Sequence, residues 1–440
     1  MIAYAGVLFS ILPRLSLWLD EIRDLMGVRS DGLAAVIEYA ARQTAAGVPL
    51  GYIAQYLVVQ TFGLSALTGR LSSAVCSVAA CLGLALLGKR LKIRHPFFPL
   101  MIFATFPLQL RYAMEARPYS QALCLSIWCT VAFFALLGRP GLTRAAVYAL
   151  SIAAGLYSQP YSVFVPFAHA CWILSARGIA QRRRVLWLGF TAMLIAAIAF
   201  LPWVIYASEH WQRTVLAEGD RFIFSWKSPL MILKELVGAG YVGTLLTLTA
   251  AAVGLFSAKL DSGQKLFWML YLAAPVVCAI AADAIFSYFL AIRQMIFVLA
   301  PLALLSSLGI DNLRTTGSRF RGLLFAALLA VNVSAGVRFF QRPREDWQPA
   351  AQRLSAEVAR GACIVFVPSH TASIYAYFQP GLDSHSCDLE RAGAVSRIAA
   401  AVSQYATPLE HADAAQRLAP DFVKIDEQPG EPRVEVYRRR

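Results

Sequence analysis

The sequence predicts an all-α polytopic membrane protein, with about 11 transmembrane helices, that ends in a small α/β domain. Hydrophobic residues make up 58% of the 440 residues and charged residues only 15%, whereas about 25% of the residues in a soluble domain are charged. Many apolar stretches approach or reach the length of about 18 residues that is typical of a membrane-spanning helix. Residues 341–440 differ from the rest, because they are polar and nearly neutral.

Hydropathy places the spans in one N-terminal transmembrane domain, residues 1–340. The connection 19–65 is long for a membrane protein and holds two helix-like runs, 33–39 and 49–59. We expect both runs to lie on the outer surface of the bilayer. The predicted spans are 1–18, 66–88, 97–112, 119–138, 145–158, 161–176, 185–207, 233–257, 266–288, 292–310 and 321–340.

Basic residues decide the predicted orientation. They gather in alternate short loops, while the short connections 158–161 and 288–292 hold none. By the positive-inside rule, the basic loops are cytoplasmic, which puts the N-terminus in the cytoplasm and the tail outside the inner (plasma) membrane. This rule explains the net charge of +14 better than nucleic-acid binding does, so we expect no nucleic-acid partner. The basic loops are 88–95, 138–145, 176–185, 257–266 and 311–322.

The tail, residues 341–440, reads as an extracytoplasmic α/β domain. Asp346 is suited to cap a helix that has Pro349 in its first turn. The apolar run 363–367 predicts a buried strand, and two alternating runs, 421–425 and 433–437, predict further strands. Two cysteines of this domain, Cys363 and Cys387, would be able to form a disulfide in an oxidising compartment, but the sequence also allows two thiols.

Two acids, Asp20 and Glu21, follow the first span. One interpretation is that they simply begin the next helix, where acidic side chains are favourable. The other is chemical, because a carboxylate at the membrane rim can act as a general base or bind a divalent cation. The residues alone leave both interpretations open.

A second charged cluster lies at the end of the third span, where Glu115 and Arg117 follow Arg111 and precede Tyr119. It would form a local salt bridge of little energetic value in a turn, or a phosphate site, since the planar guanidinium group suits forked contacts to phosphate. Arg293 stands at the outer end of the tenth span, where the positive-inside rule does not require a basic residue. We therefore favour a functional role for Arg293, with Tyr288 close by.

Other polar or glycine-rich features are weaker candidates. Asp283 lies near the outer end of a span, and so do the neighbours Lys234 and Glu235, which we expect not to face each other on a helix. The glycine pattern at 238–243 fits a dinucleotide-binding motif but follows no strand, so close helix packing explains it better. The sequence contains no P-loop, which argues against an ATP-driven transporter.

Taken together, these residues resemble the GT-C glycosyltransferases, and within them the bacterial branch related to protein O-mannosyltransferases. That branch includes the aminoarabinose transferases of lipid A and the galacturonosyltransferases of rhizobial lipopolysaccharide. The resemblance runs along nearly the whole chain. The matching motifs are Trp18-Leu19-Asp20-Glu21, Glu115-Ala116-Arg117-Pro118-Tyr119, Pro202-Trp203, Arg293 with Pro301, and Glu345-Asp346-Trp347.

Two motifs depart from the pattern of this branch. Gly47-Val48-Pro49-Leu50 stands where His-Pro-Pro-Leu is usual, and Ser158-Gln159-Pro160-Tyr161 stands where many members have a Thr-His-Tyr-like run. Because both histidines are missing, the resemblance assigns no metal or acid–base role to these positions.

The resemblance implies an enzyme that transfers a sugar, with inversion, from a polyprenyl-phosphate donor to a glycan, lipid or protein acceptor on the extracytoplasmic face. Asp20 would deprotonate the acceptor, and Glu21 would orient it or help to bind a divalent cation. Arg117 and Arg293, with Tyr119, would hold the donor phosphate. Glu115 would position Arg117, supported by Arg111. No nucleotide cofactor is expected.

Two other functions fit a polytopic protein with charged residues near the membrane. A transporter or flippase of lipid-linked sugars also needs many spans, but such proteins usually show internal repeats, and this sequence shows none. A membrane scaffold that presents its tail to a partner would tolerate replacement of Asp20.

Overall fold

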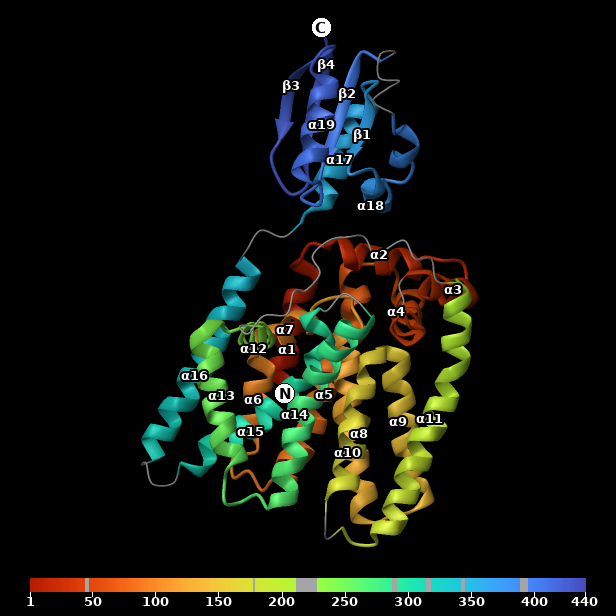
Figure 1. Cartoon of the computed structure of the whole chain (residues 1–440). Coiled ribbons are helices and arrows are strands. Elements are labelled where there is room, and N and C mark those ends of the chain that lie inside the picture. Colours follow the sequence, from red (N-terminus) through yellow and green to blue (C-terminus); the bar gives the residue numbers. More distant parts are fainter. Residues whose placement is uncertain are drawn as a thin grey trace. The chain divides into compact units, whose positions relative to one another are not determined.

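The structure is a computed structural model that describes residues 1–43, 47–176, 179–210, 228–286, 291–313, 318–341, 345–387 and 395–440. Most of these residues are helical (Figure 1). The chain divides into two compact units. The membrane unit comprises Met1–Pro13 and Gly27–Gln341, and the second unit comprises Arg14–Met26 and Arg342–Arg440. The segment 14–26 therefore belongs with the tail and not with its neighbours in sequence.

The membrane unit is built from helices alone among its described residues. Three short 3₁₀ segments, Leu12–Arg14, Pro160–Val163 and Ile292–Val298, join some of them. The helices are α1 (Ile2–Ile11), α3 (Leu33–Gln43), α4 (Pro49–Phe62), α5 (Ala66–Arg90), α6 (Phe97–Thr105), α7 (Pro107–Ala113), α8 (Tyr119–Gly138), α9 (Leu142–Ser158), α10 (Phe164–Ser175), α11 (Arg182–His210), α12 (Ser228–Val237), α13 (Gly240–Leu255), α14 (Ser262–Phe286), α15 (Leu299–Asn312) and α16 (Ser318–Gln341).

A multi-pass membrane protein is confirmed, but the count of eleven spans is not. Among the described residues, six helices are long and apolar enough to cross a membrane, or up to eight if each of two pairs of shorter helices counts as one span. The predicted span 97–112 breaks at Pro107 into α6 of 9 residues and α7 of 7 residues, because proline has no N–H to continue a helix. The spans 145–158 and 161–176 give helices of only 17 and 12 residues.

Tight packing holds the membrane unit together at two glycines, Gly254 of α13 and Gly309 of α15. A Cβ atom on Gly254 would lie 2.0 Å from the carbonyl oxygen of Leu305, and one on Gly309 would lie 1.9 Å from that of Ala250. Only glycine allows two helices to approach so closely. From the sequence, close helix packing was predicted at the glycines of 238–243 and not at these two positions.

The glycines at 238–243 have a structural explanation. Gly238 and Gly240 adopt positive φ angles of 73° and 67° in the turn between α12 and α13, where a side chain would be strained. Gly243 faces α16, and a Cβ there would lie 3.0 Å from Val331 Cγ1. Turn geometry and close packing thus account for the glycine pattern.

The second unit contains the small α/β domain that the sequence predicts. Its helices are α2 (Leu19–Val28), α17 (Trp347–Val358), α18 (Ala372–Phe378) and α19 (Pro408–Leu418). Only the part of α2 that ends at Met26 belongs to this unit. Its strands are β1 (Cys363–Val367), β2 (Arg397–Val402), β3 (Phe422–Gln428) and β4 (Arg433–Arg439), in the order β1-β2-β4-β3 (Figure 1). Strands β1 and β2 are parallel, and the other pairs are antiparallel.

Three of these strands agree with the predicted ones, whereas β2 was missed. Its centre is a run of three alanines, Ala399–Ala401, and alanine has a low preference for strands. All three are buried, so tertiary packing makes this strand. The predicted position of the helix cap is confirmed, because Asp346 is the N-cap residue of α17. Its side chain, however, makes no capping hydrogen bond.

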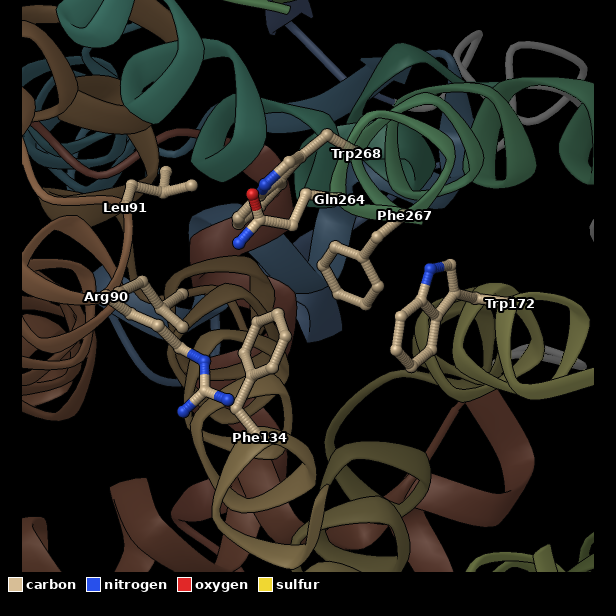
Figure 2. A pocket seen from close by; sticks show the side chains of 8 residues that line it. Arg90, Leu91, Phe134, Trp172, Gln264, Phe267 and Trp268 are labelled. Carbon is tan, nitrogen blue, oxygen red and sulfur yellow. The ribbon is translucent and has the colours of Figure 1, made fainter. Parts of the chain in front are cut away.

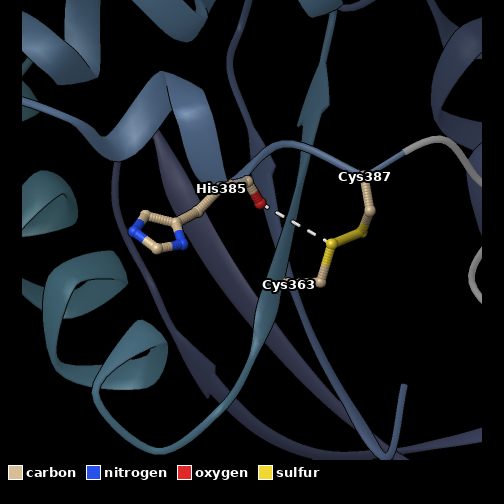
Figure 3. Close-up of a disulfide and its surroundings, with 3 residues drawn as sticks. All are labelled: Cys363, His385 and Cys387. Atoms are coloured by element: carbon tan, nitrogen blue, oxygen red, sulfur yellow. Dashed lines mark hydrogen bonds between the residues drawn. A yellow bond between two sulfur atoms is a disulfide. The ribbon is translucent and has the colours of Figure 1, made fainter. Parts of the chain in front are cut away.

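The two cysteines of the tail form a disulfide. Cys363 begins β1, and Cys387 follows 24 residues later, with the two Cα atoms 5.8 Å apart (Figure 3). The backbone N–H of Cys387 also donates to the carbonyl of Ile364 at 2.9 Å. This cross-link fastens the segment before β2 to the edge strand of the sheet.

Candidate functional site

The turn between α7 and α8 carries most of the predicted phosphate site. Arg111 and Glu115 form an ion pair across it, with 2.8 Å between Nε and Oε1. This is the local salt bridge that the sequence allowed, with 1% of the Glu115 side chain and 30% of the Arg111 side chain exposed. The pair fixes the turn that leads into Arg117.

Two neighbouring helices hold the same turn in place. The hydroxyl of Ser73 on α5 donates a hydrogen bond of 2.9 Å to the carbonyl oxygen of Arg117. Gly51 of α4 packs against Pro118, where an added Cβ would lie 3.0 Å from the proline ring. Arg117 is therefore carried by a backbone with little freedom to move.

Arg293 reaches the same place from a distant part of the chain. It lies in the 3₁₀ segment Ile292–Val298. The side-chain oxygen of Gln294 accepts a hydrogen bond of 3.1 Å from the N–H of Ala291 and so closes the first turn of this segment. The guanidinium carbon of Arg293 stands 5.7 Å from the centre of the Tyr119 ring, and that of Arg117 stands at the same distance.

Aromatic rings line this group of cations. The rings of Tyr112 and Tyr119 are 4.6 Å apart, and the guanidinium of Arg111 lies 5.1 Å from the ring of Phe339. We call the set Arg111, Tyr112, Glu115, Arg117, Tyr119 and Arg293 the Tyr119 cluster. Guanidinium groups gathered around one ring raise the local positive potential and offer planar donors, which favours an anion such as a phosphate group.

The predicted acids, Asp20 and Glu21, lie in the second unit, at the start of α2. The carbonyl of Trp18 accepts the first helical hydrogen bond, from Ile22 N–H at 3.0 Å, so Trp18 is the N-cap residue. Glu21 is fully buried and its Oε2 accepts from the N–H of Trp18 at 3.4 Å. Glu21 thus caps its own helix, while Asp20 is half-buried.

Glu345 has a role that the sequence did not predict, although its Glu-Asp-Trp motif marked the position. Its buried carboxylate accepts hydrogen bonds from the N–H of Leu19 at 2.9 Å and from the indole of Trp347 at 2.7 Å. It also accepts from Gln404 Nε2 at 2.5 Å and from the hydroxyl of Tyr405. Four donors on one carboxylate join the start of α2 to the tail.

A divalent cation bound by Asp20 and Glu21 stays a prediction. Glu21 is turned back towards the N–H of Trp18, from which its Oε2 accepts at 3.4 Å. The described residues contain no group of three or more His, Cys, Asp or Glu side chains that could hold a metal ion.

A small hollow in the membrane unit lies away from the Tyr119 cluster. Figure 2 shows it between Arg90, Phe134, Trp172 and Phe267. Its Phe134 is 15 residues beyond Tyr119 on α8, which amounts to about 22 Å along the helix. The volume of about 30 Å³ has room for about two water molecules, so we assign no sugar or lipid to it.

The weaker candidates from the sequence belong neither to the Tyr119 cluster nor to the group around Asp20, Glu21 and Glu345. The side chain of Asp283 and all of Tyr288 lie outside the described residues. Lys234 and Glu235 form an ion pair of 3.3 Å, so the expectation that they would not face each other was wrong. Lys234 also lies 4.8 Å from the ring of Tyr241.

No protein-family model and no curated protein matches the chain by sequence. Solved structures do match it. ArnT from Cupriavidus metallidurans aligns at 14% identity in its apo state, over 99% of this chain and 96% of ArnT, with a TM-score of 0.60. The form bound to undecaprenyl phosphate gives 13% identity, 99% and 97% coverage and a TM-score of 0.61.

An archaeal protein is similar as well. The oligosaccharyltransferase AglB from Archaeoglobus fulgidus, solved with an inhibitory peptide and a dolichol-phosphate, aligns at 9% identity over 91% of this chain and 69% of AglB, with a TM-score of 0.56. ArnT and AglB are both GT-C glycosyltransferases. This chain resembles them over almost its whole length and has the GT-C fold.

Proposed function

We propose that the chain is a membrane glycosyltransferase that moves a sugar from a polyprenyl-phosphate donor to an envelope glycan, lipid or protein acceptor. The observation that carries this function is the convergence of Arg117 and Arg293 on the Tyr119 ring. Chains of the same fold have been solved with undecaprenyl phosphate and with a dolichol-phosphate, both of which are polyprenyl phosphates.

In the proposed reaction, the acceptor hydroxyl attacks the anomeric carbon of the sugar. A new C–O bond forms as the bond from that carbon to the phosphate oxygen breaks, and in-line attack inverts the configuration. Asp20 takes the proton of the hydroxyl. The departing polyprenyl phosphate gains negative charge, which the guanidinium groups of Arg117 and Arg293 stabilise beside Tyr119.

The remaining predicted residues support these groups. Glu115, through its buried ion pair with Arg111, holds the turn that carries Arg117. Glu21 holds the first turn of the helix that carries Asp20. Charged groups that are fixed before the reaction stabilise developing charge more effectively than mobile ones.

We propose the inner (plasma) membrane as the location, with the N-terminus in the cytoplasm and the tail outside. The disulfide between Cys363 and Cys387 supports an extracytoplasmic tail, because disulfides persist in oxidising compartments. A lipid-linked donor suits this side of the membrane, where nucleotide sugars are not available. The proposed function therefore includes no nucleotide cofactor.

The test uses membranes that contain the wild-type chain or Asp20→Asn, each given a panel of radiolabelled polyprenyl-phosphate sugars. Label should pass to an acceptor with the wild type alone, and the active donor would identify the sugar. An Asp20→Asn chain that is normally expressed and fully active would remove Asp20 as the base. Failure of the folded wild type with every donor would count against a transferase and favour a transporter of lipid-linked sugars.

A further inference from the structure

In the helix that carries Asp20, Glu21 caps the N–H of Trp18, but the N–H of Leu19 is capped by a side chain from the α/β domain. The first N–H groups of any helix have no partner within the helix, and an N-cap serine, threonine, asparagine or aspartate usually supplies an oxygen. Trp18 is the N-cap residue of α2, and an indole ring has no oxygen to offer. The N–H of Leu19, the first residue of the helix, instead donates to Glu345, which lies 326 residues later in the chain.

Glu345 is itself held from three directions. The indole N–H of Trp347 donates to the same carboxylate oxygen as Leu19 does, and Gln404 and Tyr405 donate to the other oxygen. Trp347 is almost completely buried and its ring packs 5.1 Å from that of Tyr375. The carboxylate is therefore a fixed acceptor on the α/β domain.

Tyr405 brings the same group close to Asp20. Burial raises the pKa of the Tyr405 hydroxyl above its ordinary value, and the negative charges of Glu345 and Asp20 raise that pKa further. The hydroxyl thus stays protonated and donates to Glu345. Asp20 lies within electrostatic reach of this hydrogen-bond network.

We infer that Glu345 is a positioning residue for sugar transfer, which caps α2 from the α/β domain and thereby fixes Asp20. The inference rests on the proposed function in one respect only, the role of Asp20 as the base. The capping contact itself can be tested without any activity.

Two substitutions of Glu345 distinguish the effect of its hydrogen-bond acceptor from the effect of its negative charge. Glu345→Gln keeps one oxygen for the N–H of Leu19, because the amide of Gln404 and the hydroxyl of Tyr405 can both turn to accept from the new NH₂ group. Glu345→Leu keeps the bulk but removes every acceptor. The matched control is Glu435→Leu, since Glu435 is also a buried carboxylate of the α/β domain, bound by Tyr437 and Lys424.

The first readout is hydrogen–deuterium exchange of the full chain in nanodiscs, followed on peptides that cover residues 14–28. Glu345→Leu should expose the amides of α2 to exchange, whereas Glu345→Gln and Glu435→Leu should leave them protected. Unchanged protection in Glu345→Leu, or equal loss in Glu435→Leu, would overturn the capping role. This result stands even if the wild type transfers no sugar, so it is independent of the proposed function.

The second readout is the kinetics of transfer. A displaced base costs about a hundredfold in rate, so Glu345→Leu should lower kcat by about that factor while the KM for the donor stays within about twofold. Glu345→Gln should recover most of the rate, and Glu435→Leu should remain near the wild type. A raised KM with unchanged kcat, or a loss of rate shared by Glu435→Leu, would overturn the positioning role.

Discussion

Arg293 places its guanidinium 5.7 Å from the centre of the Tyr119 ring. Arg117 lies at the same distance from that ring, so the two guanidinium groups are no farther apart than twice this value. One arginine comes from the turn before α8 and the other from the 3₁₀ segment before α15. Tyr119 therefore joins two parts of the chain that only the fold brings together.

Replacement of Arg293 by lysine tests whether this cation binds the donor phosphate. Lysine keeps the charge but cannot make two parallel hydrogen bonds to one phosphate. We expect the KM for the donor to rise about tenfold, which corresponds to about 1.4 kcal/mol, and Arg117→Lys should behave in the same way. The measurement is initial rates at varied donor concentration.

Arg90→Lys is the matched control for both variants. The guanidinium of Arg90 also lies against an aromatic ring, 4.5 Å from the centre of Phe134, but away from the Tyr119 cluster. Its KM should match that of the wild type. Donor kinetics that are unchanged in Arg117→Lys and Arg293→Lys would remove both residues from the phosphate site.

Tyr119 should act through its ring. A cation against an aromatic face gains about 0.5–2 kcal/mol, so Tyr119→Leu should weaken donor binding by about 2- to 30-fold. Tyr119→Phe retains the ring and should weaken binding less. Equilibrium binding of polyprenyl phosphate to the two purified variants makes the comparison. Equal affinities for the leucine and phenylalanine variants would contradict a role for the ring.

The glycine contact between α13 and α15 should be essential for stability. Gly254→Ala would put a Cβ 2.0 Å from a backbone carbonyl of α15, and backbone cannot move aside as a side chain can. We expect a lower thermal unfolding temperature in detergent, with a free-energy loss of about 1–3 kcal/mol. Gly336→Ala is the control, because its Cβ would meet only Leu110 Cδ2 at 3.5 Å. Equal stability of the two variants would refute the close contact.

Sequence patterns predicted the class of fold, and the family resemblance named Arg117, Tyr119 and Arg293 as one phosphate-binding set, but neither predicted how their side chains pack. Hydropathy detects apolar composition, so it found the helical membrane protein, but it does not see breaks such as the one at Pro107. The motif at 115–119 marked Arg117 and Tyr119 because they are neighbours in sequence. That Arg293 meets the same ring depends on tertiary packing, which no local pattern contains.

The carboxylate of Glu345 illustrates a different limit. Its motif was visible, but the contact with Leu19 joins residues 326 positions apart. Likewise, β2 is a strand because buried neighbours surround its alanines, and not because alanine favours strands. Spacing in the sequence predicts neither the contact between Glu345 and Leu19 nor the strand β2.

The disulfide should stabilise the α/β domain. A cross-link that closes a loop of 24 residues contributes about 3 kcal/mol by restricting the unfolded chain. We expect reductant, or the pair Cys363→Ser and Cys387→Ser, to lower the unfolding temperature of the full chain. Differential scanning fluorimetry with and without reductant measures this. A serine pair as stable as the wild type, or free thiols in the protein purified from membranes without reductant, would contradict the cross-link.

The most direct test of the central claim is the release of free polyprenyl phosphate from a labelled polyprenyl-phosphate sugar, measured by mass spectrometry, because the acceptor need not be known in advance. Purified wild-type chain with a membrane extract should release it together with transfer of the sugar. Release should fall at least about a hundredfold in Asp20→Asn, which lacks the general base. No release by the folded wild type from any donor, or equal release by Asp20→Asn, would contradict the account.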